Sequence, residues 1–273
     1  MRKFEGLLFC TDLDGTLFAS DSSVSRENLD AIEYFKSEGG LFTFITGRPP
    51  VTTEAIFRNV QPNAPYGCAN GGAIWEPWKG EFLWVNYLSR EALELVRAVD
   101  ENLPEIAIQP NAKSRLYFSK HDRLMEVFRI ISRVPPVSCH YDEIDEPLLK
   151  VVLMHPDGEQ IRALETLLRS HPRADEFDFI RSEHSLFEIL PKGVSKGGAL
   201  RKMSELFGID RSKTLAIGDY NNDVSMLREA GVGIAVANAC ADAKAAADLV
   251  TVSNNEHAIA AVIGMLDRGE LVL

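Results

Sequence analysis

The sequence has few cysteines and no long apolar run, and both absences narrow the possible classes of protein. Its four cysteines lie far apart and form no C-x-x-C pair, so we expect neither a disulfide framework nor a zinc site. The first apolar run, Leu7–Cys10, is too short for a signal peptide or a membrane span, and no other segment comes close to one. A reducing cytoplasm is therefore the expected location.

Positive charge is also scarce in this sequence. The 273 residues carry a formal net charge of -11 at pH 7. Binding to nucleic acid or to an anionic membrane requires a basic face, so neither is expected as a partner, and no protein partner is implied. The six histidines are scattered and include no H-E-x-x-H pair. Any anion that the protein binds must therefore be held locally, by a few residues.

The beginning and the end of the chain alternate apolar strand segments with amphipathic helices. This pattern is typical of a parallel α/β sheet. In the first part, strands at 7–12 and 41–46 flank a helix at 25–37, for which Ser25 is the expected N-cap. The alternation resumes with a strand at 187–190 and continues to the C-terminus.

The middle of the chain departs from this alternation. Hairpin strands around Asn70–Gly71 are followed by a segment of α+β character. The predicted amphipathic helices of this segment span residues 89–102, 121–133 and 158–170. We therefore expect a Rossmann-like parallel-sheet core of residues 1–85 and 187–273, interrupted by an inserted α+β cap domain of residues 86–186.

Two acidic phrases follow apolar strands: D-L-D-G-T, which begins at Asp12, and G-D-Y-N-N-D, which begins at Gly218. Side chains two positions apart on an extended segment point the same way, so Asp12 and Asp14 are expected to lie close together. Two like charges raise the pKa of one of them unless a cation intervenes. The first phrase therefore requires a metal ion, a shared proton, or both.

Two more phrases stand at a predicted strand end or helix start: Thr46-Gly47-Arg48, and a glycine-flanked stretch around Lys196. In open α/β sheets, ligands bind at the carboxyl ends of the strands. Carboxylate oxygens suit Mg²⁺, which commonly lies between carboxylates and a phosphate. The residues thus indicate a magnesium-dependent phosphate site. Arg48 is expected either to steer the substrate or to pair with an acid of the cap.

These four phrases, in this order, resemble the motifs of the haloacid dehalogenase superfamily of phosphatases, and the resemblance covers most of the chain. The position of the insert is similar to that of the C2-capped members, and the phrases around Lys196 and Gly218 resemble their Cof-type IIB branch. Carried over position by position, the resemblance implies that Asp12 is the nucleophile and Asp14 the general acid and base.

The resemblance also implies roles for the other phrases. Thr46 with Gly47, together with Lys196, would bind the phosphoryl oxygens. Asp219 would hold Mg²⁺ together with the Asp12 carboxylate and the Asp14 backbone carbonyl. Two positions of the last phrase complete the set: Asn222 would contact the phosphoryl group or the metal shell, and Asp223 would lie in or next to the metal coordination sphere.

The implied function is that of a magnesium-dependent phosphomonoester hydrolase acting on small phosphorylated metabolites, particularly sugar phosphates, through an aspartyl-phosphate. The chemistry agrees with these roles, because a carboxylate can attack phosphorus and split one hard hydrolysis into two steps. Mg²⁺ and Lys196 offset the repulsion between Asp12 and the phosphoryl group. Asp14 can give a proton to the leaving alcohol and later take one from water. Substrate choice is expected to lie mainly in the cap.

Three other functions stay open at this point. A phosphomutase would use the same Asp12 chemistry but return the phosphoryl group to a second hydroxyl. A non-catalytic phosphate-binding module would keep the fold, although all four principal residues of a phosphatase are present. A serine esterase would use Ser195, which stands in a G-x-S-x-G pattern, with Asp248 and His257 as nominal partners. An EF-hand is excluded because its glycine and glutamate positions hold Val224 and Ala230.

Overall fold

The computed structural model describes residues 2–120, 126, 135 and 137–273, in two compact units. The first unit contains Met1–Thr46, Ile56–Trp84 and Ser195–Leu273, and the second contains Gly47–Ala55 and Val85–Val194. Except for Glu126, the predicted helix at 121–133 lies outside the described residues. No helix in the described ranges is long and apolar enough to cross a membrane.

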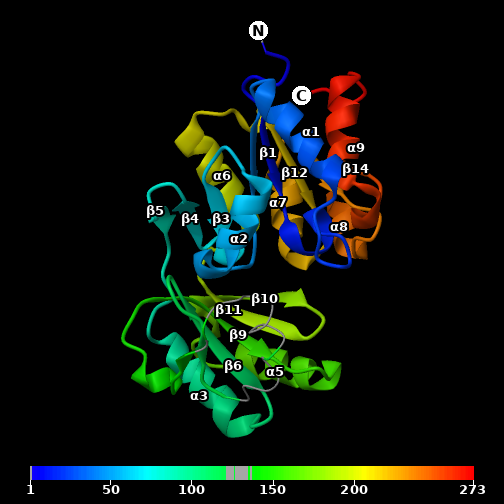
Figure 1. The fold of residues 1–273 in the computed structure, drawn as a ribbon. Helices are drawn as coiled ribbons and strands as arrows, with labels where there is room; N and C mark the ends of the chain where they lie inside the picture. Colours follow the sequence, from blue (N-terminus) through cyan, green and yellow to red (C-terminus); the bar gives the residue numbers. More distant parts are fainter. Residues whose placement is uncertain (1, 121–125, 127–134, 136) are drawn as a thin grey trace. The chain divides into compact units, whose positions relative to one another are not determined.

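A five-stranded parallel sheet forms the centre of the first unit, with the order β14-β13-β12-β1-β2 (Figure 1). Its strands are β1 (Leu8–Thr11), β2 (Leu41–Phe44), β12 (Thr214–Gly218), β13 (Val232–Ala235) and β14 (Leu249–Val250). Every residue of β1 and β12 is buried, as expected for inner strands that are covered on both faces. The prediction of a parallel α/β core is confirmed.

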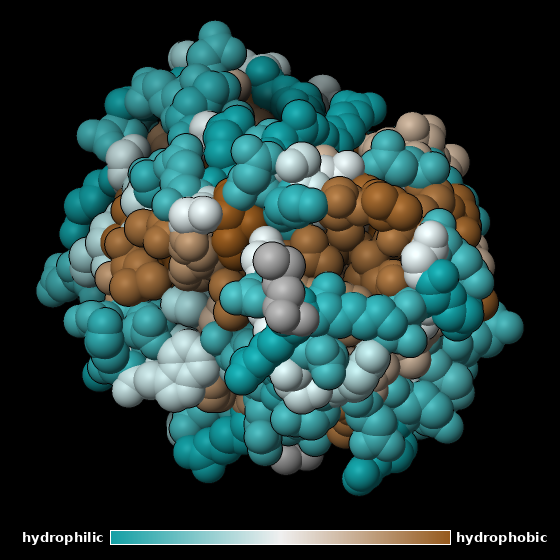
Figure 2. Space-filling model, turned by 90° about the horizontal axis from the view of Figure 1, so that it is seen from above, coloured by the Kyte–Doolittle hydropathy of each residue, from teal (hydrophilic) through white to brown (hydrophobic). Residues whose placement is uncertain are grey.

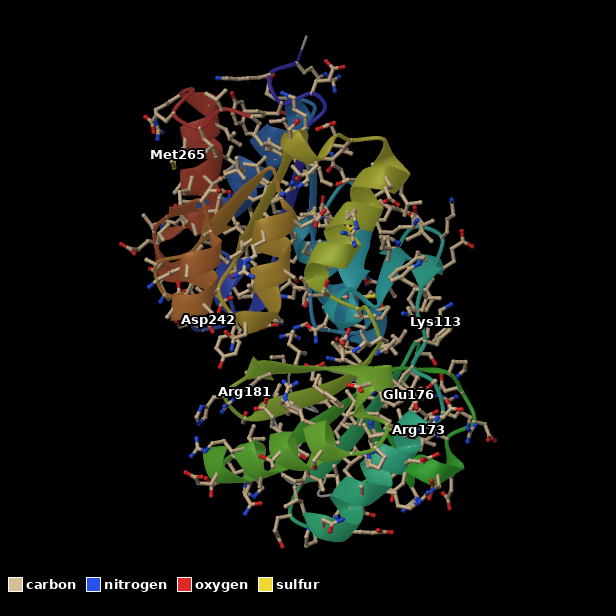
Figure 3. All side chains as sticks on the ribbon, turned by 180° about the vertical axis from the view of Figure 1, so that it is seen from behind. Lys113, Arg173, Glu176, Arg181, Asp242 and Met265 are labelled. Carbon is tan, nitrogen blue, oxygen red and sulfur yellow. The ribbon has the colours of Figure 1, made fainter. Side chains whose placement is uncertain are left out.

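Helices lie on both faces of this sheet. They are α1 (Arg26–Ser37), α6 (Lys196–Phe207), α7 (Val224–Glu229), α8 (Ala241–Ala246) and α9 (Ala258–Asp267). Figure 1 shows α1 and α9 in front of the sheet, and Figure 3, seen from behind, shows α6 in front. The predicted N-cap of α1 is confirmed, because the Ser25 side chain accepts a hydrogen bond from the backbone N–H of Asn28.

A small three-stranded sheet adjoins β2 through a parallel bridge between Ile45 and Gly67. It contains β3 (Tyr66–Cys68), β4 (Ala73–Glu76) and β5 (Glu81–Val85), in that order. The predicted hairpin around Asn70–Gly71 is confirmed, since these residues connect the antiparallel strands β3 and β4. Helix α2 (Pro50–Val60) begins among the residues of the second unit and ends among those of the first.

The second unit has an antiparallel sheet in the order β10-β11-β9-β6. These strands are β6 (Ala107–Ala112), β9 (Leu148–Met154), β10 (Phe177–Glu183) and β11 (Leu186–Pro191), and a short parallel pair is formed by β7 (Tyr117–Phe118) and β8 (Val137–Ser138). Helices α3 (Ala92–Asn102) and α5 (Gly158–Ser170) pack on one face of the four-stranded sheet, as their apolar stripes predict.

The predicted boundary at residues 186 and 187 is wrong. The segment 187–190 was expected to rejoin the parallel core, but it lies in β11 and pairs antiparallel with β9 and β10. The second unit therefore ends at Val194, immediately before Ser195 begins the helix α6 region of the first unit. A short apolar strand is compatible with either sheet, and its partners, which the sequence does not show, decide between them.

Surface hydrophobic residues do not form a stripe on any described helix. Figure 2 shows one face of the molecule, on which hydrophilic surface surrounds separate hydrophobic areas. The described large hydrophobic residues that are exposed are Tyr34, Trp78, Leu83, Tyr87, Leu206, Val250, Val252 and Val272. Since no described helix carries more than one of them, they indicate no helical docking face.

Candidate active site

The parallel sheet brings the acidic phrases together at the carboxyl ends of its central strands. Thr11 at the end of β1 is level with Ile217 of β12 and with Phe44 of β2. Asp12 follows directly, and its backbone N–H donates to the carbonyl of Ile217 over 2.9 Å. Since Asp219 and Thr46 each follow a neighbouring strand end, the fold places them at the same edge as Asp12.

Lys196 is buried between two carboxylates at this edge. It is the first residue of α6, and only 1% of it is exposed. Its Nζ lies 2.5 Å from Oδ1 of Asp12 and 2.6 Å from Oδ1 of Asp223. A buried ammonium group must be paired, and these contacts pair it twice. The lysine therefore fixes the separation of two acids that come from different phrases of the sequence.

The second phrase supplies a set of oxygen atoms. Carboxylate oxygens of Asp12, Asp219 and Asp223 all lie within 4.8 Å of one another. The remaining oxygen of Asp223 accepts hydrogen bonds from the backbone N–H groups of Asp219 and Tyr220, each over 3.0 Å. The Thr16 hydroxyl donates to Asp219 over 2.7 Å. Three carboxylates and one ammonium group leave a negative charge, so the cluster fits a hard divalent cation.

Burial shifts the ionisation of this cluster. It raises the pKa of the Asp12 carboxyl well above its ordinary value, and the attraction of Lys196 only partly opposes that shift. Burial likewise raises the pKa of Asp219 to about 6. For Lys196, burial lowers the pKa, but the charges of Asp12 and Asp223 outweigh it, so the net shift is upward. The lysine stays charged, and it supplies one positive charge against the three acids of the cluster.

The turn after Asp12 depends on Gly15. This residue has a φ of 80°, in the left-handed region, and a Cβ placed there would lie 2.6 Å from Oδ2 of Asp219. A side chain at Gly15 would therefore clash with the acidic cluster. The carbonyl of Gly15 accepts a hydrogen bond from the Asn238 side chain over 2.8 Å. Asp14, which precedes the glycine, is exposed to solvent.

The structure adds Asn70, to which the sequence assigned only a hairpin. Asn70 is 1% exposed and has a φ of 56°. Its Oδ1 accepts from the Asn222 side chain over 3.1 Å, and its backbone N–H donates to the carbonyl of Thr46 over 3.0 Å. A Cβ on the following Gly71 would overlap the carbonyl oxygen of Ser195. The turn thus connects three of the predicted site phrases.

The remaining predicted residues lie in different places. Thr46 is buried at the end of the strand region, and Asn222 is buried next to Asn70. Gly47 and Arg48 are partly exposed and belong to the second unit, so the geometry of the first unit says nothing about their approach to phosphate.

Ser195 has a structural partner. Its hydroxyl oxygen accepts a hydrogen bond from the backbone N–H of Gly198 over 3.0 Å, which makes it the N-cap of α6. The two nominal triad partners are engaged elsewhere, since Asp248 accepts from the N–H of Gly233 and His257 lies beside Glu27. A nucleophilic serine requires an adjacent base, so this arrangement does not support a serine esterase.

Comparison with known proteins connects this geometry to a family. The model of a family described as haloacid dehalogenase-like hydrolase matches residues 9–263. A Bacillus subtilis protein named 5-amino-6-(5-phospho-D-ribitylamino)uracil phosphatase YitU is 27% identical over 259 residues, which cover 93% of this chain and 94% of the relative.

Solved structures show the same fold. A haloacid dehalogenase-like hydrolase from Bacteroides thetaiotaomicron superimposes with a TM-score of 0.84 at 24% identity, over 95% of this chain and 99% of that one. A sugar phosphatase of haloacid dehalogenase subclass IIB has a TM-score of 0.83 at 20% identity, over 97% of this chain and all (100%) of that one. At these identities the two structures establish the architecture, a parallel α/β core with an inserted α+β unit.

Proposed function

The chain belongs to the haloacid dehalogenase-like hydrolases, and from this membership we propose that it is a magnesium-dependent phosphomonoester hydrolase that works through an aspartyl-phosphate. The observation that carries the proposal is the position of Lys196, 2.5 Å from Asp12 and 2.6 Å from Asp223. A lysine held against a buried carboxylate neutralises the two negative groups that must meet when a carboxylate attacks a phosphate ester.

The donor set fits Mg²⁺. Asp12, Asp219 and Asp223 offer carboxylate oxygens within 4.8 Å of one another, and hard oxygen donors are those that Mg²⁺ prefers. We propose that Asp12 and Asp219 hold the ion, together with the backbone carbonyl of Asp14, and that Asp223 holds it directly or through a water. When bound, Mg²⁺ supplies positive charge that stabilises the phosphoryl oxygens in the transition state.

The protein groups then divide the two steps of hydrolysis. A carboxylate oxygen of Asp12 forms a bond to phosphorus while the bond from phosphorus to the ester oxygen breaks, and Asp14 donates a proton to that leaving oxygen. In the second step Asp14 takes a proton from water, whose oxygen attacks phosphorus and releases Asp12 and inorganic phosphate. Thr46, with the adjacent Gly47, and Lys196 bind the phosphoryl oxygens throughout, and Asn222 orients them.

We propose small phosphorylated metabolites, including sugar phosphates, as the substrates. Two comparisons support this class: one relative is named for a phosphorylated ribitylaminouracil, and one solved structure is named a sugar phosphatase. The four free cysteines, Cys10, Cys68, Cys139 and Cys240, support the proposed cytoplasmic location.

The test is a screen of phosphorylated metabolites with the purified chain, scored for released phosphate with Mg²⁺ and with chelator. We expect release only with Mg²⁺, and none from the Asp12→Asn variant. The matched control is Asp21→Asn, which makes the same change at an exposed aspartate of the first unit and is expected to leave activity unchanged. An isomerised product without free phosphate would indicate a phosphomutase. Equal release of phosphate with Mg²⁺ and with chelator would contradict the proposal.

A further inference from the structure

Asp14 lies in a turn of the first unit that is closed by one backbone hydrogen bond. We call residues 13–18 the Asp14 turn. The backbone N–H of Phe18 donates to the carbonyl of Leu13 over 2.9 Å. Inside the turn, Asp14 (ψ 119°) and Gly15 (φ 80°) do not have helical torsion angles. Regular helical hydrogen bonds therefore do not fix the turn, and contacts with other segments of the chain determine much of its conformation.

One of these contacts comes from Asn238, in the loop 236–240 that follows β13. Its Nδ2 donates to the carbonyl of Gly15 over 2.8 Å, and its Oδ1 accepts from the backbone N–H of Asn254 over 2.9 Å. Asn238 is exposed, so water could satisfy its amide. The two bonds are thus not needed to satisfy the side chain. Their effect is to connect the middle of the Asp14 turn to Asn254.

Asn254 holds the end of the same turn. It is 6% exposed, and its Nδ2 donates to the carbonyl of Phe18 over 2.9 Å. Asn254 begins the short 3₁₀ turn Asn254–Glu256, which a capping box between Ser253 and Glu256 stabilises. Asn238 and Asn254, which we call the asparagine pair, therefore hold two carbonyls of the Asp14 turn from one connected support.

The loop 236–240 also contacts the second acidic phrase. The backbone N–H of Cys240 donates to the carbonyl of Asp219 over 2.9 Å. From the other side, the Thr16 hydroxyl of the Asp14 turn donates to a carboxylate oxygen of Asp219. Asn238 and Cys240 thus attach one loop to both acidic phrases. The asparagine pair therefore fixes the Asp14 turn relative to the acidic cluster.

We propose that Asn238 and Asn254 are positioning residues, which hold the Asp14 turn so that the Asp14 carboxyl can protonate the leaving oxygen. The inference rests on the proposed function and deepens it by adding two residues that act through Asp14. A general acid must lie within hydrogen-bond reach of the atom that it protonates, and a displacement of about 1 Å can lower a rate about a hundredfold. Since Asp14 is exposed, the core restricts it little, and the conformation of its turn matters more.

The test compares n-butyl phosphate with 4-nitrophenyl phosphate at saturating Mg²⁺. The alkoxide of butanol leaves only with a proton, whereas 4-nitrophenolate is a stable anion that leaves without one. In Asn238→Ala we expect kcat/KM for n-butyl phosphate to fall by at least about tenfold, and that for 4-nitrophenyl phosphate by less than about twofold. Asn254→Ala should act in the same direction. Asn254 is buried, so that variant is scored only if its melting temperature shows that it folds, and Asn238→Ala otherwise decides.

The matched control is Asn255→Ala. The Asn255 side chain accepts from the backbone N–H of Ser20 and donates to the Ser20 hydroxyl, each over 2.9 Å. It thus bonds to the same N-terminal segment, but beyond the Asp14 turn, and its loss should leave both rates unchanged. The inference is overturned if Asn238→Ala lowers both rates equally or lowers neither. It is also overturned if Asn255→Ala has the same effect as Asn238→Ala.

A double variant tests whether Asn238 acts through Asp14. Asp14→Asn alone removes the acid and should itself raise the ratio of the 4-nitrophenyl rate to the n-butyl rate. Adding Asn238→Ala to Asp14→Asn should then change this ratio by less than about twofold, because the group that Asn238 positions is already absent. A further rise of about tenfold in the double variant would mean that Asn238 acts on another group, and would overturn the inference.

Hydrogen exchange separates this inference from the proposed function. If the chain with Mg²⁺ releases phosphate from neither ester, the proposed function has failed, and exchange of the Phe18 backbone amide decides the remaining question. This amide closes the Asp14 turn. Its exchange should be at least about tenfold faster in Asn238→Ala and unchanged in Asn255→Ala. Unchanged exchange in Asn238→Ala, or equal acceleration in both variants, overturns the inference.

Discussion

The first and second units each bury a lysine against carboxylates, and the two arrangements are incomplete in opposite ways. Lys196 of the first unit faces Asp12 and Asp223, and a third acid lies nearby, so the hydrogen bonds are made but negative charge is left over. Lys150 of the second unit is paired with Glu188, and among the described residues Nε2 of Gln109 and Oδ1 of Asn111 on the same sheet have no hydrogen-bond partner. Excess negative charge calls for a cation, whereas a lysine paired with one glutamate does not.

The comparison also separates a cluster suited to a reaction from a pair that is not. A surplus of negative charge is useful where charge develops during a reaction, because a cation and a lysine can be concentrated on one phosphoryl group. The cluster around Lys196 has this surplus, and the pair of Lys150 and Glu188 does not share its three-acid arrangement.

The largest expected effect comes from Asp12→Asn. The substitution keeps the shape and hydrogen-bonding capacity of the side chain but removes the nucleophile, so phosphate release should fall by at least about 10⁴-fold. Because burial raises the pKa of Asp12, a neutral side chain is tolerated there and the fold should persist, as circular dichroism would check. Near-normal release from a folded Asp12→Asn chain would remove Asp12 from the reaction.

The next effect concerns stability in the second unit. Lys150→Met removes the ammonium group that lies 2.5 Å from the buried Glu188 carboxylate and should lower the free energy of unfolding by about 3–5 kcal/mol. Replacing both partners, as Lys150→Met with Glu188→Leu, removes both charges and should recover most of that loss. Denaturant unfolding measures both variants. If the single and double variants have the same free energy of unfolding, an unpaired buried charge is not the cause of the instability.

Asp219→Asn should act through the metal. We expect Mg²⁺ to raise the melting temperature of the unchanged chain, since a ligand that binds only the folded state stabilises it. In Asp219→Asn that increase should disappear, and phosphate release should fall by about 10²- to 10³-fold. The melting temperature in Mg²⁺ is a measure independent of turnover. An identical Mg²⁺ titration in the variant would exclude Asp219 as a ligand.

Asn70→Gly tests the turn between β3 and β4, which the sequence predicts only as a hairpin. Glycine keeps the positive φ but removes the hydrogen bond to Asn222, so kcat should fall by about ten- to a hundredfold with little change in KM. The control is Gln61→Gly, at another described residue with positive φ (49°), which is expected to leave kcat unchanged. Equal effects of both substitutions would mean that Asn70 matters for backbone conformation alone.

The smallest effect is the pH dependence of the metal-free chain. Burial raises the pKa of Asp219 to about 6, above its unfolded value of 3.8. At pH values between these two, the folded state therefore binds more protons than the unfolded state. The stability contributed by Asp219 is therefore present at low pH and is lost as pH rises through about 6. In the presence of chelator, the melting temperature should fall by roughly a few degrees as the pH rises through this range. Asp219→Asn should show a smaller fall.

Much of the first unit could be predicted from the sequence because its signals are local. Three of the four site phrases follow an apolar strand of this unit and the fourth begins helix α6, and the strand period and the N-cap at Ser25 are visible in consecutive residues. The family resemblance implied that Lys196 binds phosphoryl oxygens, but its contacts with Asp12 and Asp223 were not predicted. Their geometry became visible only when the parallel register placed Asp12 beside Gly218 and Asp219.

The second unit was less predictable because its partners are distant in sequence. The strand at 187–190 was assigned to the wrong sheet, since an apolar strand does not show whether its neighbours are parallel or antiparallel. The buried pair of Lys150 and Glu188 did leave a signal, a single lysine and a single glutamate within otherwise apolar strands. Two opposite charges in buried strands would have indicated a pair across one sheet.

The order of strands in the first unit also determines when the protein can assemble during synthesis. Strand β1 lies between β2, which follows it closely in the chain, and β12, which comes after the entire second unit. Pairing between segments that are distant in sequence forms slowly because closing the long loop costs entropy. The nearly contiguous second unit can therefore fold before β12 has been synthesised and has paired with β1. The acidic cluster can form only after Asp223, which lies in the last third of the sequence, has emerged from the ribosome.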